Sequence, residues 1–218
     1  MKNTLFSLAI LLTMLTVPTL AQQTNYDADV AAFEAQDKTT PPPANGILFV
    51  GSSSIRLWNN LKEAFPGKPI IQRGFGGSTM SDLIKYMPRV ILPYNPKQVV
   101  VYAGDNDLGQ ANKTARDLYN QFLTFFSLVR KQLPNATITY IAVKPSPARK
   151  QLLPVQAEAN RMIKQYLGGQ RNTSFADVYT PMLGANGQPR PELFVADSLH
   201  MNAQGYDIWK SVVGPTLK

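Results

Sequence analysis

Five short, densely apolar runs at wide intervals constrain the fold of this chain more than any other feature. They cover residues 47–50, 69–71, 98–102, 138–143 and, more weakly, 175–178. Each is too densely apolar for a strand with one face in water. Such runs are typical of strands buried on both faces of a parallel sheet.

Helical patterns lie between and after these runs. They cover residues 54–64, 78–86, 115–133, 155–167 and 203–213. The longest places Leu118, Phe122, Phe125, Leu128 and Val129 on one face. Strands that alternate with helices predict an α/β fold, in which helices cover a parallel sheet. No internal repeat or linker divides the sequence, so we expect one domain over residues 46–218.

The N-terminus reads as a signal peptide over residues 1–21. Lys2 precedes an apolar run at 5–17, Pro18 follows it, and the segment ends in the small residue Ala21. We expect cleavage near Ala21–Gln22 and a secreted or periplasmic protein. A retained membrane anchor is the alternative, but the run is short for a bilayer and no basic cluster follows it.

Residues 22–45 form a polar N-terminal segment ahead of the predicted domain. It holds one short amphipathic stretch at 30–33 and ends at three consecutive prolines, residues 41–43. Because proline stops a helix and biases the preceding residue toward extended structure, the segment ends firmly there.

Composition excludes several classes of function. The 218 residues include no Cys and one His, which rules out disulfides, thiolate nucleophiles and Cys- or His-rich metal sites. Composition therefore leaves only carboxylate-rich metal sites open. The formal net charge is +8, but the basic residues are scattered instead of gathered on one helix or arm. This pattern argues against a nucleic-acid partner.

Small and polar residues follow the predicted strands. They form four clusters, at residues 51–54, 74–79, 103–107 and 196–200. Ligands of open parallel sheets bind at the carboxyl ends of the strands. We therefore expect these clusters to form one site.

Within these clusters, His200 and Asp197 have the spacing of a catalytic pair. The carboxylate can orient one ring nitrogen while the other faces a nucleophile. A structural histidine and a helix-capping aspartate are the alternatives. Ser53 is the candidate nucleophile between a buried strand and a helix, although Ser52 and Ser54 leave the local assignment open from chemistry alone.

Gly77 and Asn106 are candidates for an oxyanion hole. A glycine lets a backbone N–H approach the substrate oxygen, and an asparagine amide is a directed neutral donor. Ordinary turns are the alternative for both. Arg149 lies in a proline-rich stretch after the fourth strand, where it could hold an anionic substrate group; a rigid extended loop is the favoured interpretation of that stretch.

In this order, the residues resemble the SGNH hydrolases, the GDSL-type esterase family. The family's first block matches residues 49–54, with Ser53 as nucleophile. Its second block matches Gly77 and its third block matches Asn106. In the family's oxyanion hole, the backbone N–H of Gly77 and the side-chain amide of Asn106 would join the backbone N–H of Ser53. The Asp-x-x-His block matches Asp197 and His200.

The sequence is also similar to the branch that contains platelet-activating-factor acetylhydrolase catalytic subunits, through residues 133–136 and Asn160. The family resemblance implies a flavodoxin-like three-layer α/β/α sandwich with strand order 2-1-3-4-5. It also implies that the enzyme uses no metal and no organic cofactor.

Two residues depart from the family pattern. Ser52 replaces the usual aspartate of the first block, which is not a member of the triad. Asp105 adds a carboxylate beside Asn106. A negative charge pointing into the site would oppose an oxyanion, so we expect Asp105 to point away, toward a lysine, an arginine or solvent.

The leading hypothesis is therefore an exported serine esterase that hydrolyses short-chain acyl esters, acetyl above all. The ester would belong to a carbohydrate or a lysophospholipid, with carbohydrate favoured because no long apolar lid is evident. Trp58 and Trp209 could stack on sugars, but core positions are the favoured interpretation. The alternatives are a lysophospholipase, a glycan O-acetyltransferase and an inactive carbohydrate-binding relative.

Overall fold

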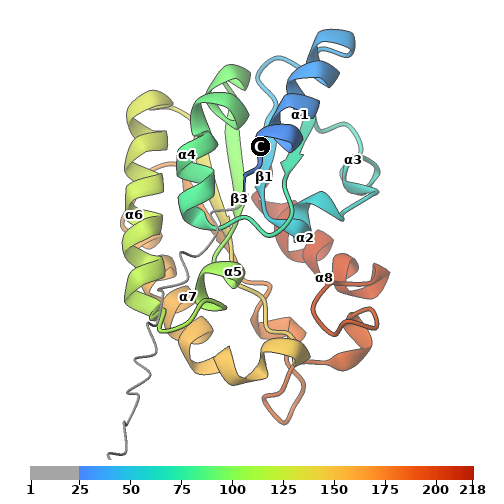
Figure 1. The fold of residues 1–218 in the computed structure, drawn as a ribbon, viewed down its shortest axis with the longest axis vertical. Helices are drawn as coiled ribbons and strands as arrows, with labels where there is room; N and C mark the ends of the chain where they lie inside the picture. Colours follow the sequence, from blue (N-terminus) through green and yellow to red (C-terminus); the bar gives the residue numbers. More distant parts are fainter. Residues whose placement is uncertain (1–24) are drawn as a thin grey trace, which may run out of the picture.

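A five-stranded sheet with helices on both faces forms the frame of the computed structural model, which describes residues 25–218 (Figure 1). The predicted signal peptide and its cleavage site lie outside the described residues. The strands are β1 (Ile47–Gly51), β2 (Ile70–Gly74), β3 (Gln98–Tyr102), β4 (Thr137–Ile141) and β5 (Thr173–Ala176). The α-helices are α1 (Asp27–Thr39), α2 (Ser53–Arg56), α3 (Leu61–Ala64), α4 (Met80–Val90), α5 (Asp105–Leu108), α6 (Ala115–Gln132), α7 (Leu153–Gly168) and α8 (Ala203–Val213). Short 3₁₀ helices cover Leu92–Tyr94, Pro147–Leu152, Thr180–Met182, Pro191–Leu193 and Gly214–Thr216.

The sheet is parallel throughout, in the order β2-β1-β3-β4-β5. Every residue of β1, β3 and β4 is buried. This burial on both faces explains the dense apolar runs in the sequence. The predicted fold class and strand order are confirmed.

Two apolar cores lie on opposite faces of the sheet. One is formed with α4, α6 and α7, and the other with α2, α3 and α8. In Figure 1 these helix groups stand on opposite sides of the strands. Trp58 and Trp209 belong to the second core, with exposed fractions of 1% and 0% and ring centroids 5.8 Å apart. They are core residues, as the favoured interpretation held, and neither can stack on a sugar.

The predicted helix over 54–64 is instead two short helices, α2 and α3. The break has a tertiary cause: the side-chain amide of Gln72 on β2 donates to the carbonyl oxygens of Ile55 and Trp58, at 2.6 and 3.1 Å. These carbonyls therefore bond across to the sheet. The helix predicted from residue 78 begins at Met80, because Thr79 and Asp82 form a capping box there.

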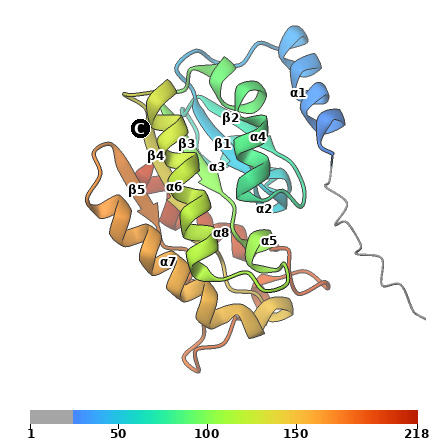
Figure 2. The ribbon, with the colours of Figure 1, turned by 60° about the vertical axis from the view of Figure 1, so that its left-hand side comes forward.

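The polar N-terminal segment forms more structure than the sequence indicated. Its short amphipathic stretch is part of α1, a helix of 13 residues that buries only Val30. Figure 2 shows α1 beside α4, outside the β2 edge of the sheet. So small an apolar face gives little hydrophobic periodicity, which is why the sequence pattern did not reveal the helix.

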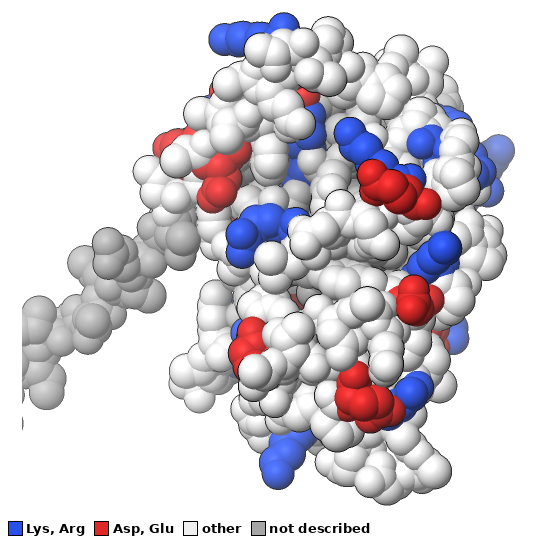
Figure 3. Space-filling view, turned by 90° about the vertical axis from the view of Figure 1, so that its right-hand side faces the viewer, with Lys and Arg blue, Asp and Glu red and all other residues white. Residues whose placement is uncertain are grey.

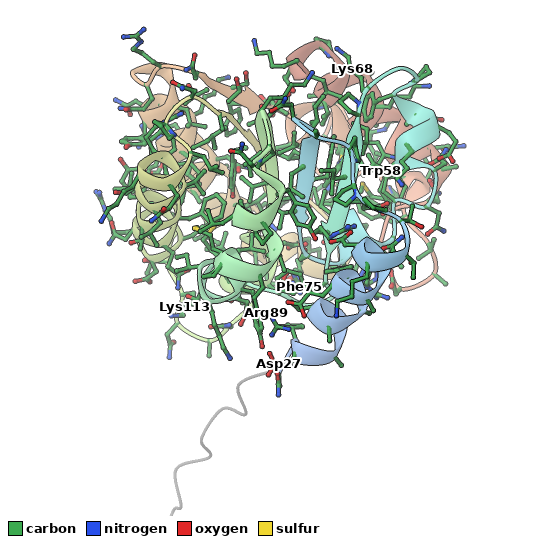
Figure 4. The ribbon with its side chains drawn as sticks, turned by 90° about the horizontal axis from the view of Figure 1, so that it is seen from above. Asp27, Trp58, Lys68, Phe75, Arg89 and Lys113 are labelled. Carbon is green, nitrogen blue, oxygen red and sulfur yellow. The ribbon has the colours of Figure 1, made fainter. Side chains whose placement is uncertain are left out.

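Polar contacts to distant residues hold α1 in place. Arg89 of α4 pairs with Glu34 at 2.7 Å and with Asp27 at 2.9 Å, and Figure 4 shows Asp27 and Arg89 side by side. The half-buried Asp37 pairs with Arg73 of β2 and accepts a hydrogen bond from the Tyr94 hydroxyl. These contacts join α1 to α4 and to β2.

Charge is interspersed over the surface that includes α2, α3 and α8. Figure 3 shows basic and acidic side chains alternating there, with no single basic patch. Between residues 25 and 218, no helix is long and apolar enough to cross a membrane.

Candidate active site

The site lies where β1, β2 and β3 end, as expected from the polar clusters. Ser53 follows β1 and is the first residue of α2. The turn needs Gly51, whose φ is +150° and whose added Cβ would lie 2.0 Å from the carbonyl oxygen of Tyr102. This close approach of β1 to β3 directs the chain into the short helix that carries Ser53.

Ser53, His200 and Asp197 form a hydrogen-bonded chain. The Ser53 Oγ atom lies 3.0 Å from Nε2 of His200, and Nδ1 of His200 lies 2.6 Å from Oδ2 of Asp197. With the Nδ1 proton facing the carboxylate, Nε2 is left as an acceptor for the serine proton. Ser52 and Ser54 are buried, with exposed fractions of 2% and 3%, and the contact with His200 belongs to Ser53.

A tight turn holds Asp197 against the histidine. Ser198 has a φ of 57°, and the backbone N–H groups of Leu199 and His200 both donate to Oδ1 of Asp197 at 2.9 Å. The hydrogen bonds from the backbone and ring of His200 lower the pKa of the Asp197 carboxyl to about 2. Asp197 is therefore ionised at every pH at which the protein would act.

Gly77 and Asn106 face the same cavity as Ser53. Gly77 has a φ of +82°, a left-handed conformation that favours glycine. Asn106, in α5, donates one side-chain N–H to the carbonyl oxygen of Ser78 at 3.1 Å. The cavity is about 380 Å³ in volume, and its lining residues are Asp29, Ser53, Arg56, Gly76, Gly77, Asn106, Leu199 and His200.

Asp105 is buried next to this cavity and points to two cations. One carboxylate oxygen lies 3.0 Å from Nζ of Lys144, and the other lies 2.6 Å from Nη1 of Arg149. Burial by itself would raise the pKa of this carboxyl, but the charges of Lys144 and Arg149 outweigh burial and lower it. The expected orientation, toward a lysine or an arginine, is the one observed.

Arg149 lies at this edge of the sheet, where the sequence placed it, but its partners are protein groups. Besides the ion pair with Asp105, its Nη2 donates to Oδ1 of Asn106 at 3.0 Å. The stretch that carries it is a loop at residues 144–146, with Ser146 extended, and becomes a 3₁₀ helix at Pro147–Leu152. The arginine that lines the cavity is Arg56.

Arg56 and Asp29 are cavity residues that sequence reasoning did not single out. Arg56 lies one helical turn after Ser53. Residues at that spacing share one face of a helix, so the sequence could have indicated that Arg56 lies near Ser53. Its guanidinium lies over Gly76, where an added Cβ would meet Nε at 2.9 Å. Asp29 comes from α1, and nothing in the sequence connected that segment to the site.

Asp107 follows Asn106 and links α5 to the start of α4. It is buried, and its Oδ1 accepts the backbone N–H of Met80, at the start of α4, at 2.9 Å. Burial raises the pKa of the Asp107 carboxyl to about 6. Within residues 25–218 no three His, Asp or Glu side chains are grouped closely enough to hold a metal ion.

The family-model comparison agrees with this fold and site. Residues 49–208 match the GDSL-like lipase/acylhydrolase family. The match spans most of the chain, so the protein belongs to that family and is by class a carboxylic ester hydrolase. The predicted SGNH resemblance is confirmed.

Solved structures with this fold include three bacterial proteins. A Streptococcus pneumonia protein named for platelet activating factor has a TM-score of 0.76 at 17% identity, covering 88% of this chain and 92% of its own. A GDSL-like lipase from Bacteroides thetaiotaomicron has a TM-score of 0.72 at 19% identity, with coverages of 86% and 96%. A catalytic mutant of an acetylxylan esterase from Geobacillus stearothermophilus has a TM-score of 0.63 at 13% identity, with coverages of 80% and 95%. No curated protein matches the chain.

Proposed function

We propose that this protein is an exported serine esterase that removes short acyl groups, acetyl above all, from a polar alcohol. The observation that carries the proposal is the chain of contacts from Ser53 through His200 to Asp197, at 3.0 and 2.6 Å. A serine hydroxyl is a weak nucleophile by itself. A neutral imidazole held by a carboxylate is the base that activates it.

In the first half-reaction, the Ser53 oxygen attacks the ester carbonyl carbon while its proton passes to Nε2 of His200. The carbonyl oxygen becomes an oxyanion, which the N–H groups of Ser53, Gly77 and Asn106 stabilise. The intermediate collapses when the C–O bond to the alcohol breaks. The alcohol oxygen takes the proton from His200 and leaves an acyl-serine.

In the second half-reaction, water replaces the alcohol. His200 takes a proton from the water, whose oxygen attacks the acyl-serine carbonyl, and the proton returns to the Ser53 oxygen when the acid leaves. Asp197 stabilises the imidazolium in both halves without accepting its proton. The net reaction is hydrolysis of one ester bond.

The cavity lining supports a short acyl group on a polar alcohol. Its side chains are mainly polar, and Leu199 is the one large apolar residue among them. A long acyl chain would need an apolar wall to offset the cost of exposing it to water. A carbohydrate acetyl ester fits better than a lysophospholipid, and an acetylxylan esterase has the same fold.

We assign recognition of the alcohol side to Arg56. The exposed Arg56 lines the cavity with Ser53, and no ion-pair partner for it exists among residues 25–218. Its charge is available to a substrate, whereas the Arg149 guanidinium is held by Asp105 and Asn106. An anionic group near the ester would therefore be bound by Arg56.

Export remains a proposal that rests on the signal-peptide pattern of residues 1–21. An extracellular or periplasmic esterase would meet O-acetylated polysaccharides outside the cytoplasm. Mass spectrometry of the N-terminus of the protein recovered from outside the cytoplasm would test it. A chain that begins at Gln22 is the expected result, and an uncleaved chain in the membrane would contradict it.

The deciding experiment is hydrolysis of p-nitrophenyl esters from C2 to C12 by the protein and by Ser53→Ala. We expect the rate to fall steeply beyond C4, and kcat to fall about 10⁴-fold or more in the variant. A preference for long chains would favour the lysophospholipase. A folded protein inactive on every ester, but active when a sugar acceptor is added, would favour the O-acetyltransferase; inactivity under both conditions would favour a binding protein.

A further inference from the structure

The Asn106 amide is held on two sides, and the two contacts determine which way it faces. Its Oδ1 accepts a hydrogen bond from Nη2 of Arg149 at 3.0 Å, and its Nδ2 donates to the carbonyl oxygen of Ser78 at 3.1 Å. A flipped amide would set Nδ2 against the guanidinium and Oδ1 against the carbonyl oxygen. Both contacts would then be repulsive.

This orientation leaves one N–H of Asn106 for the cavity. An asparagine amide carries two N–H donors, and Ser78 takes one of them. Asn106 lines the cavity together with Ser53 and Gly77. A flipped amide would instead present a carbonyl oxygen, which would repel an oxyanion. The activity of the proposed oxyanion hole thus depends on these two contacts, one of which Arg149 supplies.

The partly buried Arg149 is in turn held by the buried Asp105, which also pairs with the buried Lys144; we call these three residues the Asp105 cluster. The three residues come from α5, the segment after β4 and the 3₁₀ helix at Pro147–Leu152. Asp105 and Lys144 are 5% and 1% exposed, and the ion pairs measure 2.6 and 3.0 Å. Side chains so enclosed have few alternative rotamers, so the guanidinium is pre-oriented.

The cluster also explains how a carboxylate is tolerated beside the oxyanion hole. Asp105 carries one negative charge, whereas Lys144 and Arg149 carry two positive charges. The sum is one positive charge. In a poorly hydrated interior a lone carboxylate would act strongly on a neighbouring anion. Here its charge is more than compensated.

We propose that Arg149 is a positioning residue, held by Asp105 and Lys144, that turns the Asn106 amide so that an N–H faces the cavity. This inference rests on the proposed esterase function and adds a positioning residue to its oxyanion hole. Arg149 acts through Asn106 and does not contact the substrate.

A double-mutant cycle on p-nitrophenyl acetate tests the proposal. We expect Asn106→Ala to lower kcat by about 10²- to 10³-fold, the usual effect of losing one oxyanion donor. Arg149→Ala should lower kcat by about 10²-fold while KM changes less than threefold. The double variant Asn106→Ala/Arg149→Lys, which keeps the positive charge beside Asp105, should be within threefold of Asn106→Ala, because residue 149 has nothing to orient once the amide is gone. Multiplied losses in the double variant would overturn the proposal.

Arg149→Lys keeps the positive charge and the ion pair with Asp105. It therefore tests the proposal even if Arg149→Ala does not fold. One ammonium group cannot reproduce the two contacts of the guanidinium. We expect a melting temperature close to that of the parent protein and a kcat at least tenfold lower. A kcat within threefold of the parent would refute the positioning role. Arg161→Ala, which breaks an exposed pair with Glu158 on α7, is the matched control and should change neither quantity.

The two levels of proposal fail in different ways. Retained activity in Ser53→Ala would refute the esterase mechanism itself. An inactive Ser53→Ala together with an unaffected Arg149→Lys would refute only the role of Arg149.

Discussion

The carboxylate of Asp197 contacts His200 through both of its oxygens. Oδ2 lies 2.6 Å from Nδ1 of the ring, and Oδ1 accepts the backbone N–H of His200, and that of Leu199, at 2.9 Å. The same turn that positions the histidine therefore also orients the carboxylate. The pair is assembled within four residues, and only Ser53 has to be brought to it by the fold.

Replacing Asp197 should lower kcat more than it changes KM. An amide in Asp197→Asn cannot stabilise the imidazolium and favours the wrong tautomer, so we expect kcat to fall by about 10²- to 10⁴-fold. Steady-state kinetics on p-nitrophenyl acetate would measure it. Asp207→Asn, at an exposed position of α8, is the control. Equal kcat values for the two variants would argue against the assignment of Asp197.

Replacing Gly77 should separate backbone strain from its effect on catalysis. An alanine at a φ of +82° costs about 1–2 kcal/mol of stability, and the strain should move the N–H that we assign to the oxyanion hole. Gly187→Ala is the matched control, since Gly187 has a φ of +71° and open space around it. We expect both variants to lose similar stability in urea unfolding, and only Gly77→Ala to lose kcat, by tenfold or more. If both kept full activity, Gly77 would have no part in the oxyanion hole.

Replacing Arg56 should weaken binding of anionic esters selectively. For Arg56→Ala we expect KM for 4-acetoxybenzoate to rise about five- to tenfold, whereas KM for phenyl acetate should change less than twofold. The difference should shrink in high salt, because an exposed charge is screened. Lys113→Ala removes an equal charge outside the cavity lining and is the control. Equal rises in KM for the two esters would contradict anion recognition by Arg56.

Replacing Asp107 should change how stability depends on pH. Burial raises the pKa of Asp107 from 3.8 to about 6, so the folded state binds its proton more tightly than the unfolded state does. The protonated Asp107 therefore contributes to the free energy of unfolding below about pH 4. This contribution is lost as pH rises through 6, a change on the order of 2–3 kcal/mol. Asn in Asp107→Asn stays neutral and can still accept the Met80 N–H.

Urea unfolding from pH 4 to pH 8 would measure this change. We expect Asp107→Asn to gain stability relative to the parent protein across that range, because only the parent has to ionise a buried carboxyl. Parallel stability curves for the two proteins would show that Asp107 does not titrate as described.

Much of the fold was predictable from local sequence. The apolar runs of β1, β3 and β4 are buried on both faces, and their spacing by helices leaves few alternatives to a parallel sheet. The start of α6 follows from Thr114 and Asp117, which form a capping box. The helix α1 was not predictable in this way, since ion pairs with Arg73 and Arg89 hold it and its apolar face is small.

The sequence by itself determined which residue types follow each strand, and so which side chains meet at the carboxyl edge: Ser53, Gly77, Asn106, Asp197 and His200. Each of these belongs to a local motif, and a parallel sheet brings the ends of its strands together whatever the details of packing. Only the tertiary structure decided that Arg149 binds Asn106 and Asp105 while Arg56 lines the cavity. Buried polar side chains must find partners, and here those partners are far apart in the chain, so close packing selects them and local sequence cannot.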